Sequence, residues 1–224
     1  MERVPEPEVM DDDREVLAYD EADFRDVNVR FARRALRVAA RRSGHAVDLG
    51  TGPAEIPIYF CRMAPGWRVT AVDASASMLK AARRNVCASG LAGRIFLRRA
   101  DAKDLRGMEK MGKRFDLVFS NAVLHHLSDP LPFWLEVRRL VKPSGSVMVQ
   151  DLLRPATRAQ ARRLVSLHAK GESCLLRDLF YQSFLAAYTG SEIREQLRRA
   201  GIRGLRVRTT GDHHLTICGR IRPS

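Results

Sequence analysis

The sequence has 224 residues, of which 45% are hydrophobic and 29% are charged, as in a globular protein that can bury a core. These figures exclude a wholly disordered or fibrous chain, and the length suits one α/β domain with an elaboration. The formal net charge of +13 raises nucleic acid or a membrane surface as a partner, although an excess of surface arginine is also common on solvated faces.

The charge is unevenly distributed. Residues 1–26 hold eleven acidic and three basic residues, so this head carries −8 and the remainder of the chain carries +21. An acidic head either folds back on a basic body or stays a solvated segment, and both interpretations are open. A second concentration lies over 154–208, with twelve basic and four acidic residues. An anionic acceptor, a contact with the acidic head, or nucleic acid would each explain it.

The four cysteines are dispersed, with no close pair, so their spacing predicts neither a metal site nor a disulfide framework. Reduced thiols fit a cytoplasmic protein. The acidic N-terminus has no basic segment before an apolar stretch, and no apolar run approaches the ~18 residues of a membrane span. We therefore expect a soluble, cytoplasmic protein without a membrane span; the sequence leaves its oligomeric state open.

Residues 1–15 are predicted to form an extended acidic arm, followed over 16–42 by one or two amphipathic helices that act as a lid. Short apolar runs then alternate with helical segments, which is typical of a parallel sheet covered on both faces. Strands are predicted at 45–49, 68–72, 95–98, 115–120 and 147–152, and helices at 56–63, 77–88 and 130–141. Asp129-Pro130 is expected to begin the last of these helices, and Lys142-Pro143-Ser144-Gly145 to end it and turn the chain.

Beyond 153 the alternation stops. Residues 154–189 have a helical pattern and are interpreted as an inserted helical cap. Thr189 and Glu192 have the spacing of a capping box that opens a further helix, and strands at 205–209 and 215–220 are expected to pair as a terminal hairpin. The predicted fold is a Rossmann-like three-layer α/β sandwich with a mostly parallel seven-stranded sheet. Its parts are the acidic N-terminal arm with the lid helices (1–42), the cofactor-binding core (43–153), the cap (154–189) and the last helix with the hairpin (190–224).

Four polar or glycine-rich segments follow predicted strands, at the edge where open α/β sheets bind ligands. The first is Asp48-Leu49-Gly50-Thr51-Gly52, a tight turn before a helix. Glu55 stands where a dinucleotide fingerprint would have its last glycine, and no phosphate-loop lysine is present, so a cofactor without phosphates is favoured. Asp73 ends the second strand, where a carboxylate is placed to accept ribose hydroxyls. The third and fourth segments are Asp101-Ala102 and 120–127.

These segments resemble the motifs of class I S-adenosylmethionine-dependent methyltransferases, most closely the small-molecule branch with the ubiquinone/menaquinone-type enzymes. The matching segments are Asp48 to Gly52, Asp73-Ala74-Ser75 with Met78-Leu79, Asp101-Ala102, Phe115 to Val118 with Asn121 to His126, and Val141 to Gly145. Specific motifs cover about 44–153, and the resemblance extends to 190–220 by topology alone. Pro53-Ala54 and Ser144 depart mildly from the family pattern.

The resemblance implies S-adenosylmethionine as cofactor and S-adenosylhomocysteine as product. Gly50 and Gly52 would pass beneath the methionine portion, Asp73 would hold the ribose, Met78 would pack on adenine, and Asp101 would reach its amino group. In the lid, Tyr19 and Arg30 would close over the cofactor, with Arg30 facing its carboxylate. The full set of expected cofactor residues is Tyr19, Arg30, Asp48, Gly50, Thr51, Gly52, Asp73, Ala74, Met78, Asp101, Ala102 and Asn121.

The expected reaction is in-line methyl transfer to a small-molecule acceptor, which requires alignment and exclusion of water but no metal. Where the acceptor must lose a proton, His125 or His126 is the first candidate base, because imidazole titrates near neutrality. Asp151, at the end of the fifth strand, and Tyr181, in the cap, are further catalytic candidates.

Two alternatives stay open. An RNA or DNA methyltransferase would suit the basic body, although Ser120-Asn121-Ala122-Val123 lacks the motif typical of base-amino methylation, and the cap would crowd a polynucleotide. The same cofactor motifs would also serve an intramolecular cyclisation that releases methylthioadenosine.

Overall fold

The computed structural model describes residues 1–9, 12–106 and 115–222. Its helices are α1 (Asp13–Glu21), α2 (Arg25–Ala39), α3 (Glu55–Met63), α4 (Ala76–Ala88), the 3₁₀ turn η2 (Leu124–His126), α5 (Leu131–Leu140), α6 (Arg158–His168), α7 (Cys174–Ala186) and α8 (Gly190–Arg199). Its strands are β1 (Ser43–Leu49), β2 (Gly66–Asp73), β3 (Ile95–Arg99), β4 (Phe115–Asn121), β5 (Val141–Leu152), β6 (Leu205–Thr210) and β7 (His214–Gly219).

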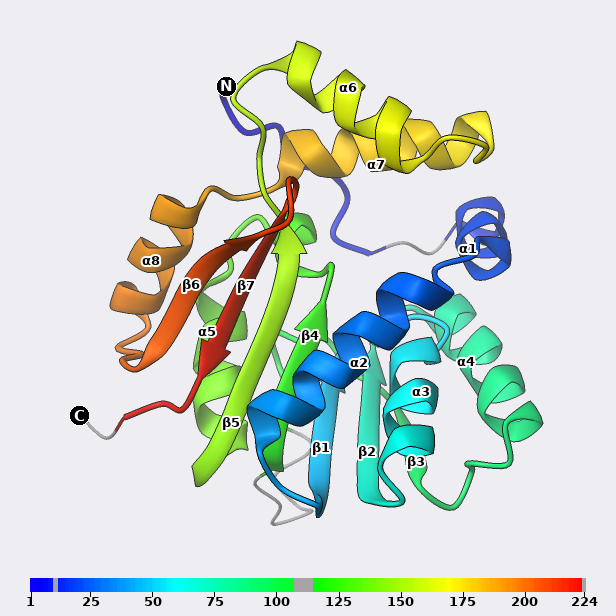
Figure 1. Ribbon diagram of the computed structural model, residues 1–224, viewed down its shortest axis with the longest axis vertical. Helices are drawn as coiled ribbons and strands as arrows, with labels where there is room; N and C mark the ends of the chain where they lie inside the picture. Colours follow the sequence, from blue (N-terminus) through cyan, green and yellow to red (C-terminus); the bar gives the residue numbers. More distant parts are fainter. Residues whose placement is uncertain (10–11, 107–114, 223–224) are drawn as a thin grey trace.

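The strands form one sheet in the order β3-β2-β1-β4-β5-β7-β6 (Figure 1). Strands β1 to β5 pair in parallel, and β7 runs antiparallel to both β5 and β6. The central strands are continuous apolar runs because helices cover both of their faces. Every residue from Phe115 to Ser120 in β4, for example, is buried. The order places the carboxyl ends of the parallel strands on one edge.

The two faces of the sheet have separate cores. On one face, α2, α3 and α4 pack through a cluster that includes Phe31, Phe60 and Trp67. The α2 stripe of Phe31, Ala32, Ala35 and Ala39 repeats at the three- and four-residue spacing of a buried helix face. On the other face, α5 and α8 pack through a second cluster, and Trp134 Nε1 donates to Gln196 Oε1 at 3.0 Å across the two helices.

A third, smaller core belongs to the cap. Helices α6 and α7 lie side by side across the end of the sheet, above the carboxyl ends of the parallel strands (Figure 1). The first residues of the chain run along α7, and Val4 N donates to Leu185 O at 3.0 Å. Helix α1 follows near α4, where Arg84 pairs with Asp20. The acidic head therefore folds back on the body.

The predicted fold class is confirmed, including the mostly parallel seven-stranded sheet and the antiparallel terminal hairpin. The capping box at Thr189 and Glu192 is present. One expectation is wrong in detail, because the segment Lys142–Gly145 lies within strand β5 instead of forming a separate turn. The pairing moves from Phe115↔Val141 to Leu117↔Ser146, so these residues form an irregularity that absorbs the extra length.

The start of α5 also differs from the prediction. Pro130 is its N-cap, and Asp129, one residue earlier, accepts the Leu131 amide at 3.1 Å. Among the described residues, no helix combines the length and apolar character needed to cross a membrane.

Truncating a ring in the α3 core is expected to destabilise the protein strongly. Phe60 is fully buried against Trp67 and Phe119, with ring centroids 5.3 and 5.4 Å away. Because Phe60→Ala leaves a cavity, it should lower the free energy of unfolding by about 3–5 kcal/mol, measured by urea denaturation. The control Leu135→Ala, at a side chain 47% exposed, should change it by less than about 0.5 kcal/mol. Equal losses would contradict this assignment of the core.

Candidate functional site

A cavity of about 620 Å³ opens at the carboxyl ends of the parallel strands, a volume within the range of small-molecule sites. Its walls come from the head, the strand-end loops, the cap and the β6–β7 turn. Among the residues predicted for the site, the cavity is lined by Tyr19, Arg30, Gly50, Thr51, Gly52, Asp73, Ala74, Met78, Asp101, Ala102, Asn121, His125 and His126. Asp48, Asp151 and Tyr181 are not among its lining residues.

The turn after β1 brings main chain to the cavity wall. Gly50 and Gly52 have φ of +74° and +53°, a left-handed conformation that glycine adopts without strain. Gly50 N and Thr51 N both donate to Val72 O, at 2.8 and 2.9 Å. A Cβ at Gly50 would lie 2.2 Å from Val123 Cγ2, so this position has no room for a side chain.

Asp48 lies beneath this turn and is almost fully buried. Burial, together with the negative charge of Asp73, raises the pKa of Asp48 to about 7. The side chain of Thr51, buried at the same turn, hydrogen-bonds to Asp48 and partly offsets the rise in its pKa.

Asp73 ends β2 and ties it to the β1 turn. Its Oδ2 accepts the Gly52 amide at 2.7 Å and its Oδ1 accepts the Ser75 amide at 2.9 Å. Ser75 caps α4, accepting the Met78 amide at 3.1 Å. Asp73 is thus held in a defined position at the cavity wall by two main-chain donors. Asp101 lines the same end, and its Oδ1 accepts the Lys103 amide at 2.8 Å.

Helices α1 and α2 close this end of the cavity. Burial, followed by the charges of Glu55, Asp73 and Asp48, raises the pKa of Tyr19 to about 12, so its hydroxyl stays protonated. Glu55 accepts from Asn28 Nδ2 at 2.7 Å, and burial raises the pKa of Glu55. A carboxylate at Glu55 disfavours a phosphate here, as the sequence predicts.

His125, on η2, forms a buried pair with Asp151. His125 Nδ1 lies 2.6 Å from Asp151 Oδ1, while Asp151 also accepts the amides of Leu124 and Leu152 at 2.6 and 2.7 Å. Burial raises the pKa of Asp151, but His125 and the two amides outweigh it, so the pKa is lowered and the carboxylate is charged. An ionised carboxylate only accepts, so Nδ1 of His125 carries the hydrogen and Nε2 faces away from Asp151.

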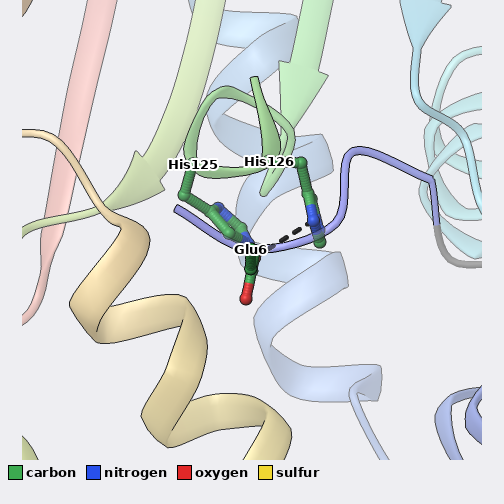
Figure 2. Close-up of side chains that lie close together, drawn as sticks. All are labelled: Glu6, His125 and His126. Atoms are coloured by element: carbon green, nitrogen blue, oxygen red, sulfur yellow. Dashed lines mark ion pairs between the residues drawn. The ribbon is translucent and has the colours of Figure 1, made fainter. Parts of the chain in front are cut away.

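The N-terminal segment 1–9 supplies the group that His125 Nε2 meets. Glu6 Oε1 lies 3.3 Å from His125 Nε2 and 3.0 Å from His126 Nδ1 (Figure 2). Burial opposes the charged form of His125, yet Asp151 and Glu6 raise its pKa above the ordinary value. His126 behaves oppositely, because burial and the adjacent His125 lower its pKa to about 4.

The far wall of the cavity is rich in histidine. His168 of α6 and His213 of the β6–β7 turn both meet Asp212, at 2.8 and 2.6 Å, and His214 also lines the cavity. Burial lowers the pKa of His214 to about 4. Leu176, Leu179 and Phe180 of α7 add apolar surface. Tyr181, on the same helix, packs with the cap core instead, with Arg162 Cζ 5.8 Å from its ring.

Sequence reasoning missed Glu6, Glu8, His213 and His214. Glu8 pairs with Lys103 and accepts the Ser128 amide at 3.0 Å, and it lines the cavity beside Val9. The acidic composition of 1–26 was the available signal for the glutamates, but it carries no information about their partners. His213 and His214 sit in a predicted hairpin turn, where their nearness to the cap depends on tertiary packing.

Comparison with known proteins gives a consistent result. Residues 47–149 match the family described as "Methyltransferase domain". Over 147 residues, 62% of this chain and 50% of the relative, the chain is 35% identical to the release factor glutamine methyltransferase of Chlorobaculum tepidum. Over 114 residues, 51% and 44% of the two chains, it is 31% identical to the ubiquinone/menaquinone biosynthesis C-methyltransferase of Paracoccus denitrificans.

The chain spans about half the length of these curated relatives. A SAM-dependent methyltransferase from Aquifex aeolicus has the same fold, with a TM-score of 0.68 and 19% identity over 95% of this chain and 100% of that one. One of these curated relatives is named for a release factor glutamine and the other for ubiquinone/menaquinone biosynthesis, so relatives alone do not identify the acceptor of this chain.

The residues present fit S-adenosylmethionine. Its sulfonium and amino groups are cationic, and the carboxylates of Glu55 and Asp73 line this end of the cavity, with Asp48 buried behind the turn. The turn at Gly50 brings main chain to the wall without intervening side chains.

Adding a methyl group at Gly50 should disrupt the β1 turn. Both φ and the clash with Val123 oppose Gly50→Ala, whereas Gly90→Ala is a matched control with φ +72° and no atom within 4 Å of the added Cβ. Gly90→Ala should cost about 1–2 kcal/mol of unfolding free energy from backbone strain alone, and Gly50→Ala should cost more. Urea denaturation of both variants measures the difference. Equal costs would mean that the turn has space for a side chain.

Proposed function

We propose that this chain, whose residues 47–149 match the methyltransferase domain family, is an S-adenosylmethionine-dependent methyltransferase that methylates a small-molecule acceptor by in-line displacement. One observation carries the proposal. A single cavity is lined both by the strand-end residues that fit the cofactor and by His168, Leu176 and Phe180 of the cap. The acceptor therefore meets the cofactor inside a space bounded by the chain itself.

The cofactor supplies an activated methyl group on its sulfonium. At the cofactor end, the Gly50 and Gly52 backbone lies beneath the methionine portion, Asp73 accepts ribose hydroxyls, and Met78 and Asp101 meet the adenine. Tyr19 and Arg30 cover this end from the head helices, with Arg30 facing the carboxylate of the cofactor. Asp48 and Thr51 provide buried acceptor and hydroxyl groups under the turn, Ala74, Ala102 and Asn121 complete the wall, and none of these residues takes part in bond making.

Enclosure favours a small acceptor over a polynucleotide. Helices α6 and α7 stand over the strand ends, and the apolar side chains of α7 share the wall with neutral imidazoles. Phosphate recognition needs an accessible row of cationic side chains, whereas this end of the cavity offers apolar surface and lone pairs. The position of the cap thus supports a compact organic acceptor with an apolar body.

His125 is the candidate base for an acceptor that must lose a proton. Its Nδ1 hydrogen is committed to Asp151, so Nε2 is the atom that would exchange a proton on the cavity side, where Glu6 Oε1 lies 3.3 Å away. Base action requires the neutral form of His125, which Asp151 and Glu6 disfavour by raising its pKa. Asp151 does not line the cavity, and we therefore assign it a positioning role instead of direct contact with the acceptor. His126 lines the cavity beside His125 as a neutral imidazole. Tyr181 has no part in this scheme.

Removing the Asp73 carboxylate should weaken the binding of the cofactor. Hydrogen bonds to a charged group contribute about 1.5–3 kcal/mol, so Asp73→Ala should raise the Kd for S-adenosylhomocysteine by at least about tenfold in titration calorimetry. Asp104→Ala, which does not line the cavity, is the control and should leave the Kd unchanged. Unchanged binding by folded Asp73→Ala would refute the placement of the ribose.

The nucleoside product identifies the reaction. Turnover with a panel of small phenols, carboxylic acids and quinols should release S-adenosylhomocysteine, detected by chromatography. His125→Gln should lower kcat by about 10²–10⁴-fold with little effect on the Kd of S-adenosylhomocysteine, as expected for loss of a general base. Methylthioadenosine as the sole product would instead indicate cyclisation, and salt-sensitive methyl transfer to RNA with none to small molecules would indicate a nucleic-acid enzyme.

A further inference from the structure

The cluster of Glu6, His125 and His126 brings three electron-pair donors together from distant parts of the sequence (Figure 2). Their ligand atoms all lie within 4.8 Å of one another. The two imidazoles come from η2, at the end of β4, and the carboxylate comes from the N-terminal segment. Methyl transfer requires at most two of these groups, so it does not explain why all three side chains lie together.

The N-terminal segment is anchored independently of the cluster. Arg3 donates to the carbonyl oxygens of Ala186, His125 and Leu127 at 2.6, 2.8 and 3.0 Å, and its Cζ lies 4.1 Å from the centroid of the Tyr188 ring. On the other side of Glu6, Glu8 is held by Lys103 and Ser128. Glu6 is therefore presented to the histidines by contacts on both sides of it.

The donor atoms have the spacing of metal ligands. In tetrahedral zinc sites with bonds of 2.0–2.2 Å, adjacent ligand atoms lie about 3.3–3.6 Å apart. Glu6 Oε1 lies 3.3 Å from His125 Nε2 and 3.0 Å from His126 Nδ1, so a small outward shift would admit the ion. His126 Nδ1 also lies 3.2 Å from Pro7 O, and metal binding would replace this contact. Asp151 accepts from His125 Nδ1, which is the outer-sphere arrangement that orients metal-bound histidines.

From this geometry we propose that Glu6, His125 and His126 bind a divalent transition-metal ion, with zinc the best match to two imidazoles and one carboxylate. Three protein ligands leave a fourth position, and both histidines line the cavity. The ion would fasten the N-terminal segment to η2 across the cavity rim. It would also occupy the His125 lone pair, so zinc should inhibit methyl transfer. Only this last consequence rests on the proposed function.

A second histidine cluster in the same cavity must be separated from the first. His168, Asp212 and His213 also place their ligand atoms within 4.8 Å of one another. There, however, His168 and Asp212 are exposed, whereas His125 in the first cluster is buried. The variant Asp212→Asn removes the charge that this cluster would offer and is the background for the test.

Equilibrium dialysis of the metal-free full-length protein against zinc tests the site. Asp212→Asn should bind one zinc ion, and adding Glu6→Gln or His126→Gln should weaken the affinity by at least about tenfold. Adding Glu2→Gln, at an exposed carboxylate on the same N-terminal segment, should leave the affinity unchanged. Thermal unfolding without metal confirms that the variants are folded.

Two results would overturn the site. If Asp212→Asn binds no zinc, a proton alone occupies the space between His125 and Glu6. If Glu6→Gln and Glu2→Gln bind zinc equally, any bound metal lies elsewhere. Zinc binding is measured without turnover, so failure to find methyl transfer would not alter either outcome, and failure to bind zinc would leave methyl transfer to stand or fall on its own assay.

Discussion

The architecture of the site depends on the turn that joins β1 to α3. Gly50 and Thr51 both donate to Val72 O, and Gly52 donates to the Asp73 carboxylate, so the ends of β1 and β2 are bound together by main-chain donors. Two successive glycine conformations with positive φ allow this connection, and Val123 packs where a Gly50 side chain would lie. The loops after β1, β2 and β4 therefore depend on one another in position, and the cavity exists because they do.

The uneven distribution of charge along the chain is explained by contacts at the same edge of the sheet. Three acidic residues of the head pair with the body, Glu6 with His125, Glu8 with Lys103 and Asp20 with Arg84. The Glu8–Lys103 and Asp20–Arg84 pairs are partly exposed, and such pairs contribute little to stability, typically below about 1 kcal/mol each. Their consequence is geometric, because they hold the N-terminal segment and α1 across the rim of the cavity. The acidic head thus completes the site without adding much to the free energy of unfolding.

Much of this structure follows from local sequence signals. Several of these signals act over a few residues, and the structure has each where the sequence predicts it: the apolar runs in β1 and β4, the glycines at 50 and 52, and the cap at Thr189. The segment Lys142–Gly145 was misread because proline and glycine indicate a turn, while pairing with β4 accommodates them as an irregularity.

The groups that sequence reasoning could not place act over long range. Glu6 contacts His125 and His126, which lie far from it in the sequence, and no periodicity of the sequence predicts that contact. Tyr181 lies on a helix with apolar residues on more than one face, so spacing alone cannot decide whether its ring enters the cavity or packs with α6. Such placements depend on how the cap and the N-terminal segment dock, which is a property of the assembled tertiary structure.

The two ends of the cavity are electrostatically distinct, and each end suits a different partner in the proposed reaction. The cofactor end holds buried carboxylates, and burial raises the pKa of Asp48 to about 7 when no cation is present. A sulfonium cofactor supplies the positive charge that keeps such a group ionised, so its charge and the buried carboxylate stabilise each other. At the acceptor end, His126 and His214 stay neutral because burial lowers the pKa of each to about 4. Neutral imidazoles offer lone pairs without adding charge, which suits an acceptor proton or a metal ion. The cavity thus has carboxylates at one end and neutral imidazoles at the other, a division that matches the proposed positions of the cofactor and the acceptor.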